Sequence, residues 1–508
     1  AGSYTWGYRE MHSWQLGFTG SYGNTFGRHS VFLGLDGSLF DTKNLGYSLW
    51  VRGFANDKLT DISNAAGFAT ERPSATDTQS RRVGFTMTGN YNFDSRYFVD
   101  FSYRLDGSSS FGSQNRFAPF WSLGFGYTVS QENFIQENLP WMNLLRLRYS
   151  YGVTSALPSD PYKALTTYEY DRDQRYNGDM GATLKGIGNA NLRWQDTYQH
   201  NIGVDLTLFN EILSIQGNYY RKETKNYISD VGLTYSHGFQ NYAENVGTLR
   251  NVGGELNLSV NLLRNQNIMW SVRGAMSWNE NKIVSLSDEM KRQIEEQVNH
   301  QSAADTYLQY REGESMDAIY VHISPGVDAA TGEVLYVDRY GRVSSTLDIR
   351  AKYKVGNETP KVNARFSTMF RYKSFSVNTG FELRLGGQKL NSTLLNKVEN
   401  AYPQVNVDKR VLTERWEKPG DVTRYKGLNN DTNTPANSRF VADESTFILR
   451  NVNIQYDFPR RISKFFGMER LSVSGNLNDL FYLSTIEQER GISYPFSVRP
   501  SFSLSCTF

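Results

Sequence analysis

The last twelve residues of the chain alternate between apolar and polar side chains without a break. Every second position carries an apolar residue: Val498, Pro500, Phe502, Leu504, Cys506 and Phe508. Successive side chains of a β-strand point to opposite faces, so this segment predicts a strand with one apolar and one polar face. An edge strand of a soluble β-sandwich has this pattern, and so does the closing strand of an outer-membrane barrel. A terminal aromatic residue is typical of the barrel, where we expect Phe502, Leu504 and Phe508 to form the insertion signal.

The same alternation recurs along the whole chain and predicts fifteen strands. In one of them Leu145, Leu147 and Tyr149 alternate with Arg146 and Arg148. The predicted strands span residues 13–25, 29–42, 80–93, 96–106, 117–129, 144–155, 196–208, 213–226, 247–263, 268–281, 361–372, 375–387, 444–457, 469–479 and 497–508. Many of them are long enough to cross a bilayer at barrel tilt, whereas strands of soluble proteins usually have about five or six residues.

The connections between these strands differ in length from one side to the other. If Phe508 lies at the periplasmic side, the periplasmic connections are mostly short: 26–28, 94–95, 130–143, 209–212, 264–267, 373–374 and 458–468. The connections on the outside are then mostly long: 43–79, 107–116, 156–195, 227–246, 282–360, 388–443 and 480–496. Outer-membrane barrels have this asymmetry, and soluble sandwiches have no reason for it. Arginines on the polar face also suit a water-filled lumen, so the sequence favours a transmembrane antiparallel β-barrel, an all-β fold.

Composition agrees with a barrel wall. Aromatic residues make up 14% of the 508 residues, and the mean hydropathy is −0.54. No stretch approaches the ~18 consecutive apolar residues of a membrane helix, while lipid-facing and lumen-facing residues of a barrel cancel in the mean. A formal charge of +2 argues against a nucleic-acid partner. The lone Cys506 excludes an internal disulfide and a cysteine-based metal site.

The strand count predicts that the barrel continues beyond this chain. Fifteen is odd, whereas single-chain bacterial barrels close with an even number of strands. The N-terminus also has no charged segment followed by an apolar one, as a secretory signal would. We therefore expect residues 1–508 to be the C-terminal part of one barrel domain.

A series of short motifs follows one order along the chain. They are Arg104–Gly112 (RLDGSSSFG) with Asn115–Phe117, Asn191–Gln195 (NLRWQ), Asn245–Leu256 (NVGTLRNVGGEL), Asn281–Ile283, Thr331–Glu333, Arg415–Trp416 with Pro419–Asp421, and Leu449–Val452. The ordered series resembles the SusC-like branch of the TonB-dependent outer-membrane transporters, which is typical of Bacteroidetes. In that branch the first motif usually carries arginine where this chain has Ser110. The resemblance spans nearly the whole chain.

This resemblance implies a barrel of about 22 strands whose lumen holds a plug. The plug domain, the TonB box and the first strands would then precede residue 1. The resemblance also implies import of an oligosaccharide or oligopeptide, energised through the TonB–ExbB–ExbD system. A SusD-like surface lipoprotein would cover the outer mouth as a lid, in a dimer of transporter–lipoprotein pairs.

Aromatic residues of the long connections are the candidates for cargo contact, because aromatic rings stack on sugars and on peptide side chains. By connection, the candidates are Tyr162, Tyr168, Tyr170 and Tyr176; Tyr320, Tyr336 and Tyr340; Trp416 and Tyr425; and Phe481, Tyr482 and Tyr494. For each of them the alternative is packing of the loop on itself or on the lid. A short amphipathic helix is also predicted over Asp288–Asn299 in the longest connection.

Candidates for catalysis and metal binding are weak. The six histidines are scattered without zinc-like spacing, and neither a G-x-S-x-G nor an H-E-x-x-H motif occurs. We expect no enzyme and no cofactor, although calcium in an extracellular loop or in the partner lipoprotein stays open. A passive porin-like channel, an outer-membrane hydrolase barrel and a soluble β-structured binding module remain the alternatives.

Overall fold

The computed structural model describes residues 2–508, apart from 57, 60, 70–72, 112–115, 157–164, 190, 233–240, 300–309, 403, 405–406 and 487–498. Side chains at 156, 171–176, 231–232, 241 and 297–299 are not described either. No helix of the described residues is long and apolar enough to span a membrane. The chain divides into two compact units. Unit 1 comprises residues 1–126, 150–199 and 224–247, and unit 2 comprises residues 127–149, 200–223 and 248–508.

All fifteen predicted strands are present, and they follow one another in sequence order in one sheet. Their bounds are β1 (Ser3–Phe26), β2 (His29–Arg52), β4 (Ser74–Phe93), β5 (Tyr97–Ser108), β6 (Phe117–Thr128), β7 (Met142–Ala156), β10 (Gln195–Leu208), β11 (Leu213–Gly232), β12 (Asn241–Arg264), β13 (Ile268–Leu286), β19 (Val362–Tyr372), β20 (Phe375–Leu390), β21 (Val441–Asp457), β22 (Arg470–Ser484) and β23 (Pro500–Thr507). The described pairs are antiparallel, as in β1–β2 and β22–β23.

Several strands extend beyond their predicted bounds at the end that carries the long connections. The β1–β2 ladder runs without a register shift from the pair Phe26 and His29 to the pair Ser3 and Arg52. Apolar alternation is interrupted by Glu10 and Asp41, which occupy positions in the apolar register, and it resumes beyond them at Tyr8 and Leu45. Backbone hydrogen bonds do not depend on side-chain polarity, so the ladder continues through the interruption.

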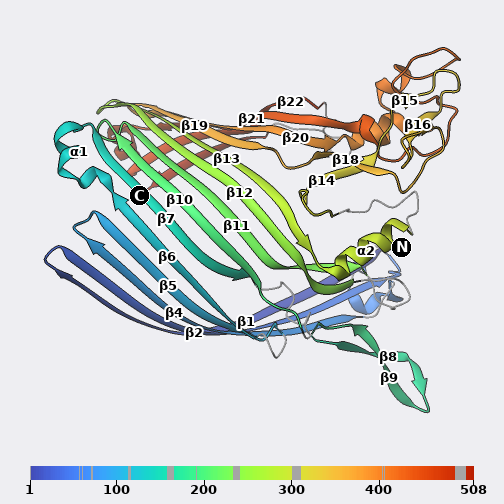
Figure 1. The fold of residues 1–508 in the computed structure, drawn as a ribbon, viewed down its shortest axis with the longest axis horizontal. Coiled ribbons are helices and arrows are strands. Elements are labelled where there is room, and N and C mark those ends of the chain that lie inside the picture. The colour runs from blue at the N-terminus through green and yellow to red at the C-terminus, as the bar shows by residue number, and fades with distance from the viewer. Residues whose placement is uncertain are drawn as a thin grey trace. The chain divides into compact units, whose positions relative to one another are not determined.

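The long connections of unit 1 contain short elements. They are η1 (Ile62–Asn64), β3 (Gly67–Phe68), which pairs with β2, and a separate hairpin of β8 (Thr167–Tyr176) and β9 (Asp179–Gly186). Figure 1 shows this hairpin as a separate pair of strands beside its labels. Its turn is Asn177-Gly178, with φ of 51° and 91°, and Asn-Gly favours the tight turn of a two-residue hairpin. Our strand prediction treated this whole segment as a loop.

The short connections lie where they were predicted, with bounds that agree to within two residues. Asp94 and Ser95 join β4 to β5 with φ of 56° and 55°, which fits a type I′ turn. Two of the longer ones contain small helices instead of bare turns. These are η2 (Val129–Gln131) with α1 (Asn133–Asn138), and α3 (Arg460–Phe465).

The two longest connections belong to unit 2 and contain most of its other elements. The predicted helix forms as α2 (Asp288–Asn299). It is followed by β14 (Ala318–His322), β15 (Gly326–Val327), β16 (Val334–Val337), β17 (Val343–Ser344) and β18 (Lys352–Asn357). β14 pairs with β18, and β15, β16 and β17 form a second small sheet. The later connection contains a π-helix, η4 (Leu394–Glu399), and two 3₁₀-helices, η5 (Lys409–Leu412) and η6 (Ser438–Phe440).

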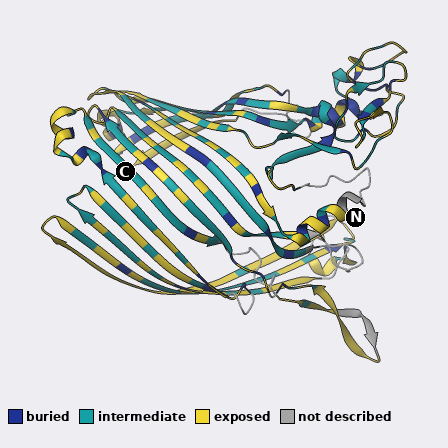
Figure 2. Ribbon diagram, viewed as in Figure 1, coloured by how far each residue is buried: buried dark blue, intermediate teal, exposed yellow. Residues whose placement is uncertain are grey.

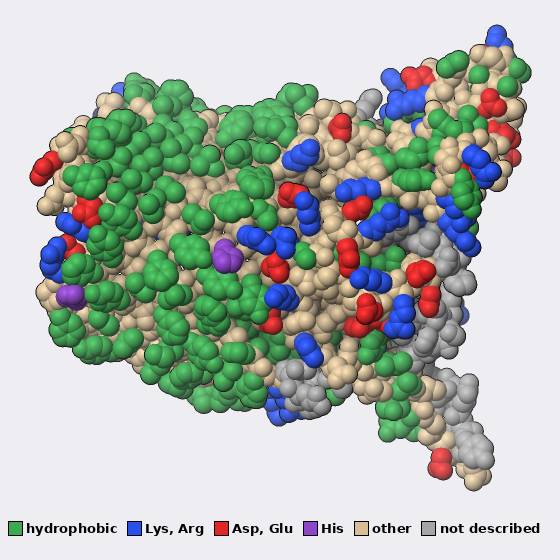
Figure 3. Space-filling view, in the orientation of Figure 1, with side chains coloured by type: hydrophobic (Ala, Val, Ile, Leu, Met, Phe, Trp, Pro, Cys, Tyr) green, Lys and Arg blue, Asp and Glu red, His purple; other side chains and the backbone are tan. Residues whose placement is uncertain are grey.

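The long strands have an apolar face and a polar face, as the alternation predicts. Leu16, Phe18 and Phe502 on the apolar face are 63%, 62% and 84% exposed. Figure 3 shows hydrophobic side chains gathered over the strand segments near the short connections, and charged side chains gathered nearer the long connections. Soluble proteins rarely expose apolar patches of this extent, so the apolar face fits lipid. Cys506 is a free, exposed thiol on β23, in the same register as Phe502.

Deep burial is rare along the strands and concentrates in the loops of unit 2. Figure 2 shows the strands mainly as intermediate or exposed, with buried residues grouped around β15 and β16. A single sheet buries neither face by itself, whereas the loops fold on one another. The compact hydrophobic core that we describe next therefore lies in the loops.

Candidate functional site

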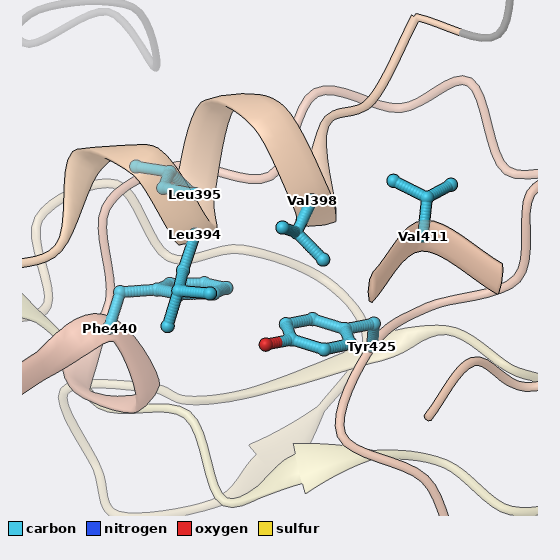
Figure 4. Close-up of a cluster of buried hydrophobic side chains, with 6 residues drawn as sticks. All are labelled: Leu394, Leu395, Val398, Val411, Tyr425 and Phe440. Carbon is cyan, nitrogen blue, oxygen red and sulfur yellow. The ribbon is translucent and has the colours of Figure 1, made fainter. Parts of the chain in front are cut away.

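The two longest connections of unit 2 fold together around a hydrophobic core. We call residues 311–357 and 391–440 the loop module. Figure 4 shows the six side chains of its core, which are Leu394, Leu395, Val398, Val411, Tyr425 and Phe440. Val398 is fully buried, and Phe440 and Tyr425 are 1% and 2% exposed. Such a core gives the loop module a defined conformation of its own.

Hydrogen bonds join the two segments of the loop module. The indole N–H of Trp416 donates to the carbonyl of Ala329 at 2.9 Å. The backbone N–H of Ser324 donates to Oγ of Ser438 at 3.0 Å, and a β-bridge joins His322 to Asn437. These contacts explain why the two longest loops behave as one structural element.

A buried group of charges lies beside this core. The carboxylate of Glu399, which is 1% exposed, accepts hydrogen bonds from Nη2 of Arg439 at 2.8 Å and from Oγ1 of Thr434 at 3.1 Å. Arg415 donates to the backbone carbonyls of Lys426 and Glu399 at 2.8 and 3.2 Å. Burial lowers the pKa of both Arg415 and Lys426. These contacts all lie within residues 391–440, so they stabilise that segment of the loop module.

The loop module buries several of the predicted cargo aromatics. Tyr425 belongs to the core, and Tyr336 is 7% exposed, with burial raising its pKa to about 12. Trp416 is half-buried and holds the two loop segments together. The hydroxyl of Tyr320 is buried and has no hydrogen-bond partner among the described residues. Tyr340 is 73% exposed, so it is the predicted aromatic of the module that a ligand could reach.

The predicted aromatics of the 156–195 connection lie on the separate hairpin of unit 1. Tyr168 and Tyr170 on β8 are 67% and 70% exposed, and Tyr176 ends the same strand. Tyr162 and Tyr494 lie outside the described residues. Tyr168 and Tyr170 are thus presented to solvent by a strand and not by an irregular loop.

Phe481 and Tyr482 lie on β22 and not in the connection that follows it, because the strand continues to Ser484. The ring of Phe481 lies edge-on to Phe447, with 6.5 Å between centroids. Phe447 also stacks with Phe381 and Phe366 in an aromatic row across neighbouring strands. This row is on the apolar face, so Phe481 faces the side we assign to lipid. Tyr482, the next residue, points to the opposite face.

Ion pairs line the polar face of the strands in unit 2. Arg148 on β7 makes a bidentate contact with Asp205 on β10, with both N–O distances at 2.8 Å. Its guanidinium also donates to the amide oxygen of Asn218 on β11 at 3.1 Å. Bidentate arginine–carboxylate pairs fix geometry as well as charge. The prediction of arginines on a polar wall is confirmed at Arg148.

A second network on this face is centred on Glu382 of β20. Its carboxylate accepts from Nε of Arg384 and from Nε of Arg450, both at 2.7 Å. Arg450 also donates to Asp479 at 3.0 Å. In the β20–β21 register Gly380 pairs with Asn451 and Phe381 pairs with Leu449, so Arg450 is the extra residue of a bulge. The bulge directs the Arg450 side chain to the polar face, out of simple alternation.

These strands enclose a hollow on the polar face, which we call the polar hollow. Its volume is about 860 Å³, and its lining includes Asp205, Asn257, Arg273, Arg365, Glu382 and Arg450. A smaller hollow of about 500 Å³ shares Arg365 and Glu382 and is also lined by Glu255. Hollows of a few hundred Å³ with convergent polar groups are typical of ligand sites. The sequence analysis missed this site, although charges at polar-register positions of β13, β19 and β20 were a usable signal.

Two of the sequence motifs meet in unit 1. The rings of Phe111, from the RLDGSSSFG motif, and Trp194, from the NLRWQ motif, stack with 4.1 Å between centroids. Asn245, which begins the NVG motif, accepts from the backbone N–H of Arg193 at 2.9 Å and donates to its carbonyl at 3.1 Å. The three motifs therefore have a structural function, which is to hold the ends of the long connections together.

Metal-binding residues do not cluster in the described part of the chain. No group of three or more His, Cys, Asp or Glu side chains is placed there to hold a metal ion. Of the acidic residues in the 156–195 connection, Asp160 lies outside the described residues, as do the side chains of Asp171 and Asp173.

Comparison with known proteins agrees with the fold and the motifs. Residues 1–480 match the family model described as TonB dependent receptor-like, beta-barrel. TonB-dependent receptor P3 of Formosa agariphila is 28% identical over 487 residues, which cover 90% of this chain and 46% of that protein. TonB-dependent receptor SusC of Bacteroides thetaiotaomicron is 25% identical over 330 residues, covering 63% of this chain and 33% of that protein. The chain thus spans less than half the length of these relatives.

Among solved structures, the RagAB peptide transporter has the same fold, with a TM-score of 0.82 at 23% identity, over 95% of this chain and 53% of that chain. Receptor P3 and SusC are both named as TonB-dependent receptors, and neither is named as an enzyme. The SusC-like resemblance and the all-β transmembrane barrel are both confirmed. The chain belongs to the TonB-dependent receptor-like β-barrel family and is a SusC-like protein of the outer membrane.

Proposed function

We propose that the whole protein imports a nutrient across the outer membrane with energy delivered by the TonB–ExbB–ExbD system. The observation that carries the proposal is the match of residues 1–480 to the TonB-dependent receptor barrel. A polar hollow on the opposite face from the lipid-facing aromatics supports it, because an importer needs a hydrated wall along the path of its cargo.

The cargo in this proposal is an oligosaccharide or an oligopeptide, and a SusD-like surface lipoprotein acts as the lid. The similarity to SusC and to the RagAB peptide transporter supports both parts of the proposal. The loop module supports the lid, since a preformed core lets exposed loops present a fixed surface to a partner. Tyr168, Tyr170 and Tyr340 are the exposed aromatics that we propose for contact with cargo or lid.

The plug domain and the TonB box are proposed to belong to the part of the protein that precedes this chain. Gating and energy coupling would then be functions of that part, and residues 1–508 would supply the wall, the loop module and the polar hollow.

Purification of the native protein from outer membranes in gentle detergent, followed by mass spectrometry, tests the proposal. We expect a longer form of this chain together with a SusD-like lipoprotein, and a co-purified sugar or peptide would identify the cargo class. Uptake of that cargo should stop when TonB is deleted. Uptake that continues without TonB would instead establish a passive channel.

A further inference from the structure

Two arginines of the polar hollow have no hydrogen-bond or ion-pair partner among the residues that the structure describes. Arg273 on β13 and Arg365 on β19 both line the hollow and are both exposed. No ion pair or hydrogen bond of either guanidinium occurs within the described ranges of the chain. Most other charges of this wall are paired, so these two stand out as available binding groups.

The neighbouring arginines differ because each of them is already bound. Arg148 is held by Asp205, and Arg384 and Arg450 share Glu382, with Asp479 as a further partner of Arg450. Glu382 is directly opposite Arg365 in the β19–β20 register, but its two oxygens already accept from the other arginines. Its single negative charge is therefore already shared by two arginines before Arg365 is counted.

The register brings the two free guanidinium groups close together. Arg273 pairs with Ser367, and Ala275 pairs with Arg365, so the two arginines are diagonal neighbours on the same face. Diagonal neighbours lie ~7–8 Å apart at their Cα atoms, within reach of long side chains. Two arginines at this separation can direct their donors at one anion between them.

The charge balance favours a singly charged anion. Glu255 lines the adjoining smaller hollow with Arg365, is exposed, and is not engaged in a described ion pair. Two unpaired arginines and one unpaired glutamate leave one positive charge in excess. One carboxylate would neutralise it, whereas a doubly charged group would overcompensate.

We propose that Arg273 and Arg365 form a binding site for a carboxylate that enters the polar hollow. The proposal deepens the proposed function, because the hollow lies on the wall that we assign to the cargo path. The carboxylate has two sources, which are an acidic group of the cargo and an acidic side chain from the part of the protein that precedes this chain. Both sources present the same chemistry to the two guanidinium groups.

Arginine labelling of the full-length protein in native outer membranes tests this site. Phenylglyoxal modifies free guanidinium groups, and mass spectrometry reports the extent at each arginine. The probe is glutarate, and its uncharged diamide, glutaramide, is the matched control compound. Arg371 serves as an internal control, because it is exposed on the same face of the same strand as Arg365 but does not line the hollow.

If the cargo supplies the carboxylate, Arg273 and Arg365 are labelled in the resting protein and glutarate protects both, while glutaramide protects neither. Arg371 should be labelled equally in all samples. In the Arg273→Gln variant, the glutarate concentration that half-protects Arg365 should rise about tenfold, the effect of one charged hydrogen bond. The Arg371→Gln variant should leave that concentration unchanged. If both arginines are labelled and glutarate does not slow their labelling, the proposal is overturned.

If the protein itself supplies the carboxylate, both arginines resist labelling before any probe is added. The double variant Arg273→Gln/Arg365→Gln should then lower the Tm of the full-length protein, and Arg371→Gln should not. Resistance without this loss of Tm would mean that the arginines are only covered, which also contradicts the proposal. The labelling requires neither uptake nor TonB, so its failure is distinguishable from failure of the proposed transport function.

Discussion

The phenyl ring of Phe111 lies against the indole of Trp194, with an interplanar angle of 21°. Both side chains are buried, at 3% and 6% exposure, and Phe120 meets the indole edge-on. Truncation of such an aromatic leaves a cavity, so we expect Trp194→Ala to lower the free energy of unfolding by about 3–5 kcal/mol. Trp194→Phe keeps a stacked ring and should cost clearly less. Denaturant unfolding of the full-length protein in detergent measures both, and equal losses would contradict a packing function for the stack.

Glu382 holds two arginines on the polar face, and only 7% of its side chain is exposed. Glu382→Gln should lower the free energy of unfolding by about 2–3 kcal/mol, because charged hydrogen bonds to two guanidinium groups are lost. The matched control is Glu280→Gln, since the Glu280–Lys282 pair is more than half exposed on both sides and should contribute less than about 1 kcal/mol. Similar losses in the two variants would show that the network is not stabilising.

The apolar face can be tested with single arginines. We expect a single arginine on this face to destabilise the barrel folded in lipid by about 2–4 kcal/mol if the position lies near the bilayer midplane. The variants that test this are Phe101→Arg, Leu147→Arg and Phe502→Arg. The three side chains are 39%, 44% and 84% exposed on the face we assign to lipid. Ser102→Arg, one residue along β5 on the polar face, is the control and should have little effect. No loss at any of the three positions would mean that the assignment of faces is reversed.

Gly332 lies against the ring of Trp416 in the loop module. A Cβ at this position would approach the indole to 2.5 Å, and its φ is +73°. Gly341 has a φ of +80° with nothing within 4 Å of its Cβ position, so it shares the backbone strain without the clash. We expect Gly332→Ala to destabilise the module by about 1–3 kcal/mol more than Gly341→Ala, measured by hydrogen exchange of the two loop segments. Equal effects would contradict the close contact.

His322 should make the loop module sensitive to acid. The side chain is 3% exposed, and burial lowers the pKa of the imidazole below its ordinary value of 6.5. The unfolded loop therefore binds a proton at a higher pH than the folded loop does. Stability is full above pH 6.5 and falls as the pH drops from there towards the pKa of the folded state. Hydrogen exchange of the module should accelerate over this range, and His322→Gln should flatten the pH dependence. An unchanged slope in the variant would assign the effect to another group.

The strands could be predicted from the sequence because the apolar and polar faces of each strand appear as an alternation of apolar and polar residues. Alternation at Leu145–Val153 or Ser497–Phe508 needs no knowledge of neighbours. The bounds of β1 and β2 could not be predicted, since Glu10 and Asp41 interrupt the pattern while the backbone ladder continues. The β8–β9 hairpin was missed because the sequence feature that indicates it is the Asn177-Gly178 turn and not apolar–polar alternation.

The site was harder to predict, because it depends on which strands meet. Alternation places Arg273, Arg365 and Glu382 on the polar face, but only the register shows which of them are neighbours. Arg450 reaches the same wall through a bulge against β20, which breaks the parity that alternation relies on. In the loops, Tyr336 and Tyr340 look alike in the sequence, and only the fold shows that one is buried and the other exposed.

The position of Cys506 has a practical consequence. It is the one thiol among the 508 residues, and it lies exposed on β23 in the same register as Phe502. A nitroxide or an environment-sensitive dye attached there would report, without any substitution in this chain, the depth of its last strand in the membrane.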